Sequence, residues 1–272
     1  MGTEKKTSPN VESRLRHILR MPQEVYSASG IVVNGRRLKS FVFTTDLAII
    51  RNCDADAVFA VYPFTPQQAI SHAIIQASYI PVFCGVGGGT TKGMRTLQLA
   101  QDVEGQGAMG VVLNSPISDL NLLAVSRVVD IPVIITVTKA DTDIQARLDA
   151  GASILNVACS TETPQVVRRI REQFPDIPII ASGGKTGESI AETIAAGANA
   201  ITGDFSLQSA GFLIENGKKT THVKSFTVAG NFYQLLKNIT ALANNTQLPT
   251  PFGMTTFGAP SVLVEGLSIA GK

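Results

Sequence analysis

Two glycine-rich runs in this 272-residue chain could bind an anion. The first, GGGTTK at 87–92, and the second, SGGK at 182–185, both end in a lysine. Small residues let backbone N–H groups approach a phosphate, and a helix that begins just after the run adds a favourable dipole. The alternatives are a mobile lid or flexible connection for the first run and a tight turn for the second. The candidate phosphate-binding residues are Gly87, Gly88, Gly89, Gly183, Gly184 and Lys185.

Four further residues have side chains suited to acid–base or carbonyl chemistry. Lys139 directly follows an apolar run, where a desolvated lysine could form a Schiff base or act as a base; a solvated lysine at a helix cap is the alternative. Asp46 could be a general base or the N-cap of the helix DLAIIRN. Asn114 and Asn156 could orient a substrate carbonyl or satisfy local backbone groups.

The cysteines and histidines give little support to other chemistries. Cys84 and Cys159 lie near the ends of apolar runs, where a thiol is more often an inert core residue than a nucleophile. His17, His72 and His222 are isolated, and neither an HxxxH nor an HExxH pattern occurs. The sequence therefore predicts no metal site and leaves any cofactor unidentified.

An internal repeat indicates the fold that must position these residues. Ile-Pro steps alternate with Gly-Ala steps, at 80–81, 107–108, 131–132, 151–152, 177–178 and 197–198. Each repeat opens an apolar run, and continuous apolar runs are typical of parallel strands that are covered on both faces. The predicted strands are 40–45, 57–62, 81–86, 108–113, 132–138, 152–157, 177–182 and 199–202. About eight such strand-plus-helix units close into a (β/α)8 barrel, whose chemistry lies in the loops after the strands.

The two ends of the predicted barrel are less regular. An amphipathic helix at 9–20 is expected to pack under the barrel, and an Asn34-Gly35 hairpin precedes the first barrel strand. Seven helices follow the first seven strands. No helical pattern follows Thr202, so the eighth helix is atypical. The fold class is thus α/β, a TIM-like barrel with an irregular closure.

The glycine loops at these positions resemble those of phosphate-binding TIM barrels, over about residues 38–205. In that superfamily, glycine loops after strands seven and eight hold a phosphate, and the resemblance implies this role for Gly183, Gly184 and Lys185. The eighth loop departs from the pattern, because Asp204 beside Gly203 would repel a phosphate. The implied protein is a lyase, isomerase or hydrolase that acts on a small, phosphorylated metabolite.

After Thr202 the sequence changes to turns and alternating residues, which predicts an antiparallel α+β module. Its expected parts are an Asn216-Gly217 hairpin, a strand at 223–228, a helix at 231–245 and a last strand at 261–272. The barrel lacks its last helix, so we expect the helical part of this tail, Phe232 to Leu242, to cover the apolar stripe that remains. The domains are therefore 1–30, 31–205 and 206–272.

The segments 203–217, 226–239 and 259–271 resemble the C-terminal end of the TldD/PmbA proteins, a family of metallopeptidases. The zinc-binding HExxxH helix of that family is absent from this sequence, so no metal ligand carries over. The resemblance implies a folded or pairing module without protease chemistry. We interpret the chain as a fusion of a barrel with this module.

Composition limits the partners. With 44% hydrophobic residues, 16% charged residues and a net charge of +2, the chain predicts a globular domain with no nucleic-acid partner. Three cysteines, a polar start and no long apolar run favour a cytoplasmic protein with no membrane partner. Two functions stay open: an enzyme for a small, phosphorylated ligand, and a peptidase-accessory or interaction protein. A homo-oligomer, or pairing through the C-terminal module, is compatible with both.

Overall fold

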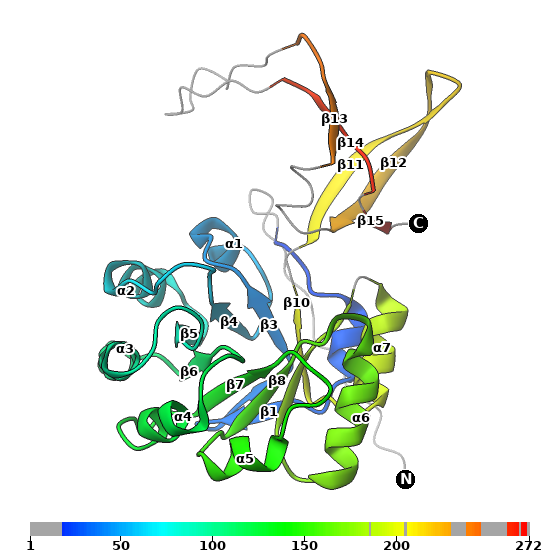
Figure 1. Cartoon of the computed structure of the whole chain (residues 1–272). Coiled ribbons are helices and arrows are strands. Elements are labelled where there is room, and N and C mark those ends of the chain that lie inside the picture. Colours follow the sequence, from blue (N-terminus) through cyan, green and yellow to red (C-terminus); the bar gives the residue numbers. More distant parts are fainter. Residues whose placement is uncertain are drawn as a thin grey trace, which may run out of the picture.

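A computed structural model of the chain describes residues 18–184, 186–203, 206–229, 238–245, 260–266 and 268–270. Its main body is a closed barrel of eight parallel strands, which confirms the predicted fold (Figure 1). Parallel pairing of the last strand with the first, with Ile201 opposite Ser40, closes the barrel. The strands are β3 (Ser40–Phe43), β4 (Ala57–Ala60), β5 (Val82–Gly87), β6 (Gly110–Leu113), β7 (Val133–Val137), β8 (Ile154–Val157), β9 (Ile179–Ser182) and β10 (Ala200–Gly203).

Seven helices surround the barrel, one after each of its first seven strands, as predicted. They are α1 (Leu47–Arg51), α2 (Gln68–Ala77), α3 (Met94–Gly105), α4 (Asp119–Ser126), α5 (Ile144–Asp149), α6 (Thr163–Gln173) and α7 (Gly187–Ala195). A short 3-10 helix, η2 (Ser160–Glu162), leads into α6. Each sequential strand–helix unit returns the chain to the same end of the barrel, so every loop that follows a strand opens at one mouth.

The barrel interior is a packed core. Phe41, Phe59 and Phe83 come from three neighbouring strands, and their ring centroids lie 4.9 to 6.0 Å apart. At the N-terminal end, the hairpin of β1 (Ile31–Val33) and β2 (Arg36–Leu38) packs its buried side chains against the same cluster. Asn34 and Gly35 both have positive φ, as the predicted tight turn requires. The interior is therefore filled by side chains, and the hairpin packs at the end of the barrel opposite the C-terminal mouth.

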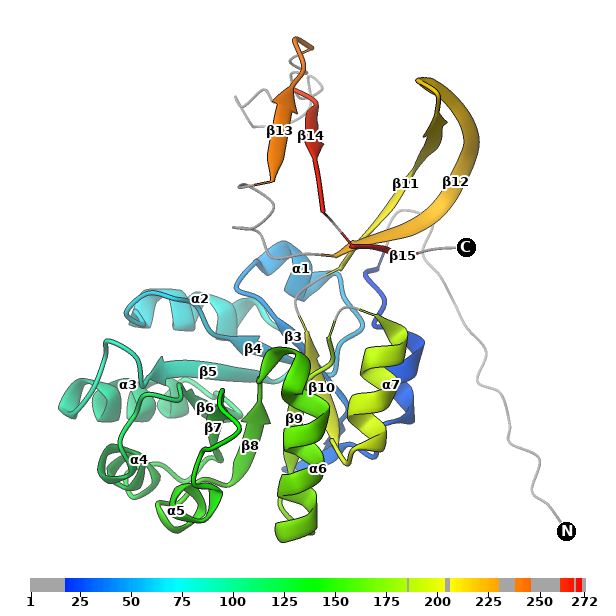
Figure 2. The ribbon, with the colours of Figure 1, turned by 45° about the vertical axis from the view of Figure 1, so that its right-hand side comes forward.

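The N-terminal segment occupies the place of the missing eighth helix. Leu19 forms a parallel bridge with Cys53, just after α1, and η1 (Gln23–Ser27) lies beside α7 (Figures 1 and 2). Val25 is 2% exposed and belongs to the core cluster that also contains Val42 of β3 and Ile201 of β10. The segment from Leu19 to Ser27 therefore lies where the sequence analysis expected Phe232 to Leu242. Of that tail segment, Ile239–Leu242 pairs as a strand with Val262–Val264, and residues 232–237 lie outside the described residues.

Shortening Val25 tests this arrangement. We expect Val25→Ala to lower the free energy of unfolding by about 2 kcal/mol, because it leaves a cavity between the N-terminal segment and the barrel wall. The measurement is urea denaturation. Val32 of β1 is 62% exposed, and the matched variant Val32→Ala should change stability by less than about 0.5 kcal/mol. Equal effects of the two substitutions would show that η1 does not seal the barrel.

The C-terminal part of the chain forms small antiparallel sheets beyond the C-terminal end of the barrel (Figure 2). One sheet contains β11 (Ser206–Glu215), β12 (Lys218–Ala229) and β15 (Ser268–Ala270), and the other contains β13 (Ile239–Leu242) and β14 (Val262–Val264). Asn216 and Gly217, both with positive φ, form the predicted β11–β12 hairpin. This confirms an antiparallel module.

Two helix predictions at the chain ends need correction. The helix expected at 231–245 is wrong over Ile239–Leu242, which pairs as a strand with Val262–Val264; residues 231–237 lie outside the described residues. The helix expected at 9–20 is wrong over residues 18–20, where the chain bridges to Cys53 in an extended form; residues 9–17 are likewise not described. Tertiary pairing overrides helical spacing in both segments. Within the described part of the chain, no helix combines the length and apolarity needed to cross a membrane.

Candidate functional site

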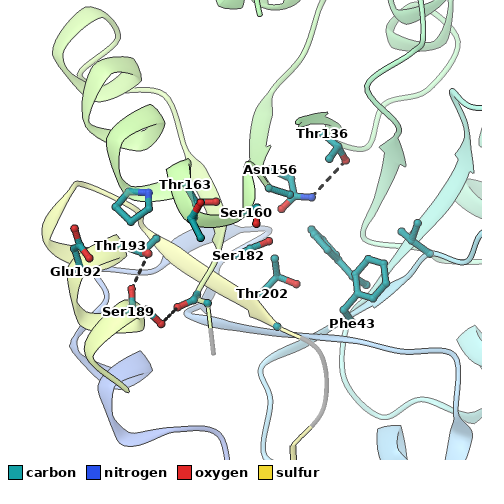
Figure 3. A pocket seen from close by; sticks show the side chains of 18 of the residues that line it. Phe43, Thr136, Asn156, Ser160, Thr163, Ser182, Ser189, Glu192, Thr193 and Thr202 are labelled. Carbon is teal, nitrogen blue, oxygen red and sulfur yellow. Dashed lines mark hydrogen bonds between the residues drawn. The ribbon is translucent and has the colours of Figure 1, made fainter. Parts of the chain in front are cut away.

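A cavity of about 790 Å³ opens at the C-terminal mouth of the barrel. Its wall combines strand ends, which supply neutral polar side chains, with the loops that lead into α6 and α7 (Figure 3). A volume of this size suits a small metabolite. Its main polar lining residues are Asn114, Thr136, Asn156, Ser160, Thr161, Thr163, Ser182, Thr186, Ser189, Glu192, Thr193 and Thr202.

Two buried polar atoms in this cavity have no hydrogen-bond partner. They are Oδ1 of Asn156, a residue 5% exposed on β8, and Oγ1 of Thr202, a residue 4% exposed on β10. The amide nitrogen of Asn156 donates to Thr136 Oγ1 at 3.4 Å, which leaves the amide oxygen to face the cavity (Figure 3). A buried polar atom without a partner costs about 1–3 kcal/mol. A ligand that hydrogen-bonds to both residues would recover this free energy.

The loop after β9 is held rigidly at the cavity edge. Gly184 has a φ of 78°, and an added Cβ would lie 2.4 Å from Ser189 Oγ. Ser189 and Thr186 form a capping box at the start of α7, and Ser189 Oγ also donates to the Gly183 carbonyl at 2.9 Å. Gly183 and Gly184 therefore form a tight turn and also line the cavity. Lys185, the third member of the predicted phosphate site, lies outside the described residues.

A turn after β8 is a second candidate for anion binding, and the sequence analysis missed it. Cys159 has φ −99° and ψ 27°, and Ser160 after it has a φ of 56°. Successive residues of this kind turn their backbone N–H groups toward one side, a concavity that suits anions. The Cys159 N–H already donates to Thr163 Oγ1 at 3.0 Å, so the N–H groups that follow it are the ones left for a ligand. Ser160 and Thr161 line the cavity where η2 leads into α6. Serine is common in loops, so the residue type gave no signal; only its place directly after a strand could have indicated it.

The structure brings together some of the predicted site residues. Asn114, Asn156, Gly183 and Gly184 all line the large cavity. Gly87 and Gly89 line a smaller pocket of about 180 Å³ beside it, which Asn114 also lines. Gly88 lines neither pocket and packs on the backbone of Asn114. Two glycine loops and two asparagines from separate parts of the sequence thus meet at one mouth.

Lys139 and Asp46 do not line either of these pockets. Asp46 Oδ1 accepts hydrogen bonds from the backbone N–H groups of Ala48 at 2.7 Å and Ile49 at 3.3 Å, so the carboxylate is the N-cap of α1. Of the two roles that the sequence allowed for Asp46, general base and helix N-cap, the structure shows the N-cap. Lys139 is exposed, and its carbonyl accepts from the Thr142 hydroxyl at 2.8 Å. The geometry therefore gives neither residue a catalytic position.

Burial keeps the thiols unreactive. All three cysteines are buried, and burial raises the pKa of the Cys84 thiol to about 12. Burial, followed by the nearby charge of Glu162, raises the pKa of Cys159. Because a raised thiol pKa favours the protonated form, these side chains carry almost no thiolate at neutral pH. This agrees with their predicted place in the core.

The described lining of the large cavity contains one ionisable side chain, Glu192 of α7. Among the described residues, no group of three or more His, Cys, Asp or Glu side chains could hold a metal ion. Apart from Glu192, the described lining offers neutral hydrogen-bonding groups and backbone dipoles. Such groups can bind and orient a ligand that carries its own charge.

Comparison with known proteins supports a composite chain. Residues 177–271 match the family of the PmbA/TldA metallopeptidase C-terminal domain. Metalloprotease PmbA of Escherichia coli O157:H7 is 34% identical over 87 residues, and the PmbA homolog of Haemophilus influenzae is 30% identical over 87 residues. Each alignment covers 32% of this chain and 18% of the relative, so the chain spans a small part of the relatives it matches. These matches confirm the TldD/PmbA resemblance of the tail.

The barrel resembles solved structures at the level of fold. Phosphoenolpyruvate phosphomutase from Streptomyces platensis subsp. rosaceus superposes with a TM-score of 0.51 and 15% identity, covering 65% of this chain and 77% of that chain. Oxaloacetate acetylhydrolase superposes with a TM-score of 0.50 and 11% identity, covering 62% of this chain and 75% of that chain. The likeness confirms a TIM barrel. The family match begins at residue 177 and so includes β9, α7 and β10, which close this barrel.

Proposed function

We propose that the barrel is an enzyme that binds a small, phosphorylated metabolite at its C-terminal mouth and acts on it by carbonyl chemistry. The reaction class is lyase, isomerase or hydrolase. The observation that carries the proposal is the pair of buried, unpartnered atoms, Asn156 Oδ1 and Thr202 Oγ1, inside a 790 Å³ cavity. Polar groups without partners at such a place are typical of a site that is completed by its ligand.

The lining suggests how the ligand is held. Backbone N–H groups at Gly184 and at the Ser160 turn supply dipoles for the phosphate, and α6 and α7 both begin at this wall. Asn156 accepts a hydrogen bond from a substrate hydroxyl, and Thr202 donates to a carbonyl oxygen that gains charge during reaction. Glu192 is the one described lining group that could exchange a proton.

Substitution of Gly203 tests anion binding in the folded protein. Gly203 lines the cavity, and an added Cβ would meet no atom within 4 Å. We therefore expect Gly203→Asn and Gly203→Asp to fold normally. The carboxylate should weaken binding of inorganic phosphate by about tenfold or more through charge repulsion, whereas the isosteric amide should leave binding within about threefold. Phosphate titration followed by NMR gives both constants.

A wild-type chain that shows no phosphate binding would contradict the proposal. So would equal binding by the Asn and Asp variants, because the anion would then lie away from Gly203. Binding that depends on the residue at 203 supports it.

The match of residues 177–271 to the PmbA/TldA domain favours a second candidate, a peptidase-accessory or interaction protein whose barrel is a scaffold. Under this proposal, the C-terminal module pairs with a complete protein of that family. We expect co-purification with such a protein to require residues 203–272. A chain that lacks residues 206–272, folds and still binds phosphate unchanged would argue for the enzyme. A full chain that binds no phosphate but co-purifies with the family protein would argue for the scaffold.

A further inference from the structure

A second pocket, the side pocket, opens beside the large cavity. It has a volume of about 180 Å³ and lies between the loop after β4 and the loop after β5. Val61 and Asn114 line both cavities, so the two share a wall. The other lining residues are Tyr62, Pro63, Phe64, Pro66, Gly85, Gly87, Gly89, Thr90 and Thr91.

The side pocket is rich in hydrogen-bond donors that lack acceptors. Thr91 is 4% exposed, and its hydroxyl has no partner. The Tyr62 hydroxyl accepts the backbone N–H of Gln67 at 2.8 Å, which leaves its own proton to donate. Among the described residues, no acceptor bonds the backbone N–H groups of Gly89 and Thr90. The wall therefore suits a ligand that only accepts hydrogen bonds.

Gly89 has no structural need to be a glycine. An added Cβ at Gly89 would meet no atom within 4 Å, and its φ is ordinary, whereas Gly87 and Gly88 have positive φ and close contacts. The absence of a side chain at Gly89 instead leaves the backbone open to the side pocket. Neither its backbone angles nor a close contact requires a glycine at this position, and the open backbone is available to a ligand in the side pocket.

The charges also favour an anion. The described lining of the side pocket contains no acidic side chain. Lys92 and Arg95 follow in the same loop and in the first turn of α3; both are exposed and lie outside the lining. A water molecule occupies about 30 Å³ in the liquid, so the volume is enough for a carboxylate with two or three attached carbons. A neutral ligand would leave the donors poorly matched.

We infer that the side pocket binds a carboxylate group through Thr91, Tyr62 and the Gly89–Thr90 backbone. That this carboxylate belongs to the substrate rests on the proposed function: the phosphate end then lies near Gly184, and the acid end lies beyond Asn114. The substrate class is accordingly a small, phosphorylated carboxylic acid.

The test compares propanoate with propanamide, which has the same shape and no charge, by NMR titration of the full chain. Propanoate should shift the backbone signals of residues 87–92, and propanamide should not at the same concentration. Thr91→Val should weaken propanoate binding about tenfold, because the hydroxyl donates to a charged acceptor. Thr96→Val is the matched control, since Thr96 is also buried, at 0% exposed, and its hydroxyl is also unpartnered, but it does not line the side pocket.

Equal propanoate affinity in Thr91→Val and in the wild type would overturn the inference, and so would equal binding of propanamide. Phosphate titration of the same samples separates this result from the proposed function. Propanoate binding without phosphate binding would keep the side pocket as a carboxylate site and remove the proposed enzyme. Phosphate binding without propanoate binding would keep the proposed enzyme and remove the side pocket as a carboxylate site.

Discussion

Replacing Gly88 by alanine will lower the free energy of unfolding by on the order of 3 kcal/mol or more. Gly88 has a φ of 103°, where an L-residue is strained, and the added Cβ would lie 2.5 Å from the backbone nitrogen and 2.6 Å from the carbonyl oxygen of Asn114. A backbone cannot move aside as a flexible side chain can. Urea denaturation of the purified variant measures the loss.

The neighbouring glycine provides the control. Gly89→Ala should change stability by less than about 0.5 kcal/mol, because it adds a methyl group to open space at an ordinary φ. Similar losses for the two variants would mean that the run from 87 to 89 is uniformly strained. A large loss at Gly88 alone would show that this position requires a glycine against the backbone of Asn114 and that Gly89 is not needed for folding.

The barrel could be predicted from the sequence because parallel strands are buried on both faces. Their apolar runs are continuous, and all eight predicted strands overlap observed ones. The piece that completes the wall could not be predicted in the same way. Val25 lies in a short 3-10 helix of five residues, which has too few turns to give a periodic pattern, and this helix packs against α7, far away in the sequence.

The site was predictable in part for a similar reason. The position of Asn156 on a buried strand limits its side chain to the barrel interior or the helix layer, so the residue type was informative. A loop position leaves the direction of a side chain open. Asp46 turns back to cap its own helix, and Lys139 turns to solvent, although both follow barrel strands. Thr202 was overlooked because threonine in a strand is ordinary.

The family match and the barrel share the region from 177 to 203. The part of the chain that resembles the PmbA/TldA domain therefore begins inside the barrel and not after it. The β9 and β10 strands pair with each other and with β8 and β3, so the closed barrel depends on them. Whatever the origin of this region, its residues Gly183, Gly184 and Thr202 line the large cavity. The segment that matches a metallopeptidase domain thus supplies one wall of the proposed active site.

Thr202→Val will stabilise the unliganded protein and weaken ligand binding. Thr202 is buried and its hydroxyl has no partner, so an isosteric methyl group should raise the free energy of unfolding by about 1 kcal/mol. If the hydroxyl meets a substrate oxygen, the same change should reduce the affinity for a small phosphorylated ketone, such as dihydroxyacetone phosphate, about tenfold or more. Urea denaturation and calorimetric titration measure the two effects.

Thr193 of α7 is the control, because it lines the same cavity but its hydroxyl has a hydrogen-bond partner. It is 1% exposed, but its hydroxyl donates to the Ser189 carbonyl at 2.8 Å. Thr193→Val should therefore destabilise the protein by about 1 kcal/mol and leave ketone binding unchanged. Opposite signs in stability, with binding lost only at position 202, would identify Thr202 as a ligand-binding residue. If Thr202→Val gained stability without losing affinity, the hydroxyl would be an unsatisfied core group. Asn156 Oδ1 would then be the one remaining atom of the pair on which the proposed enzyme depends.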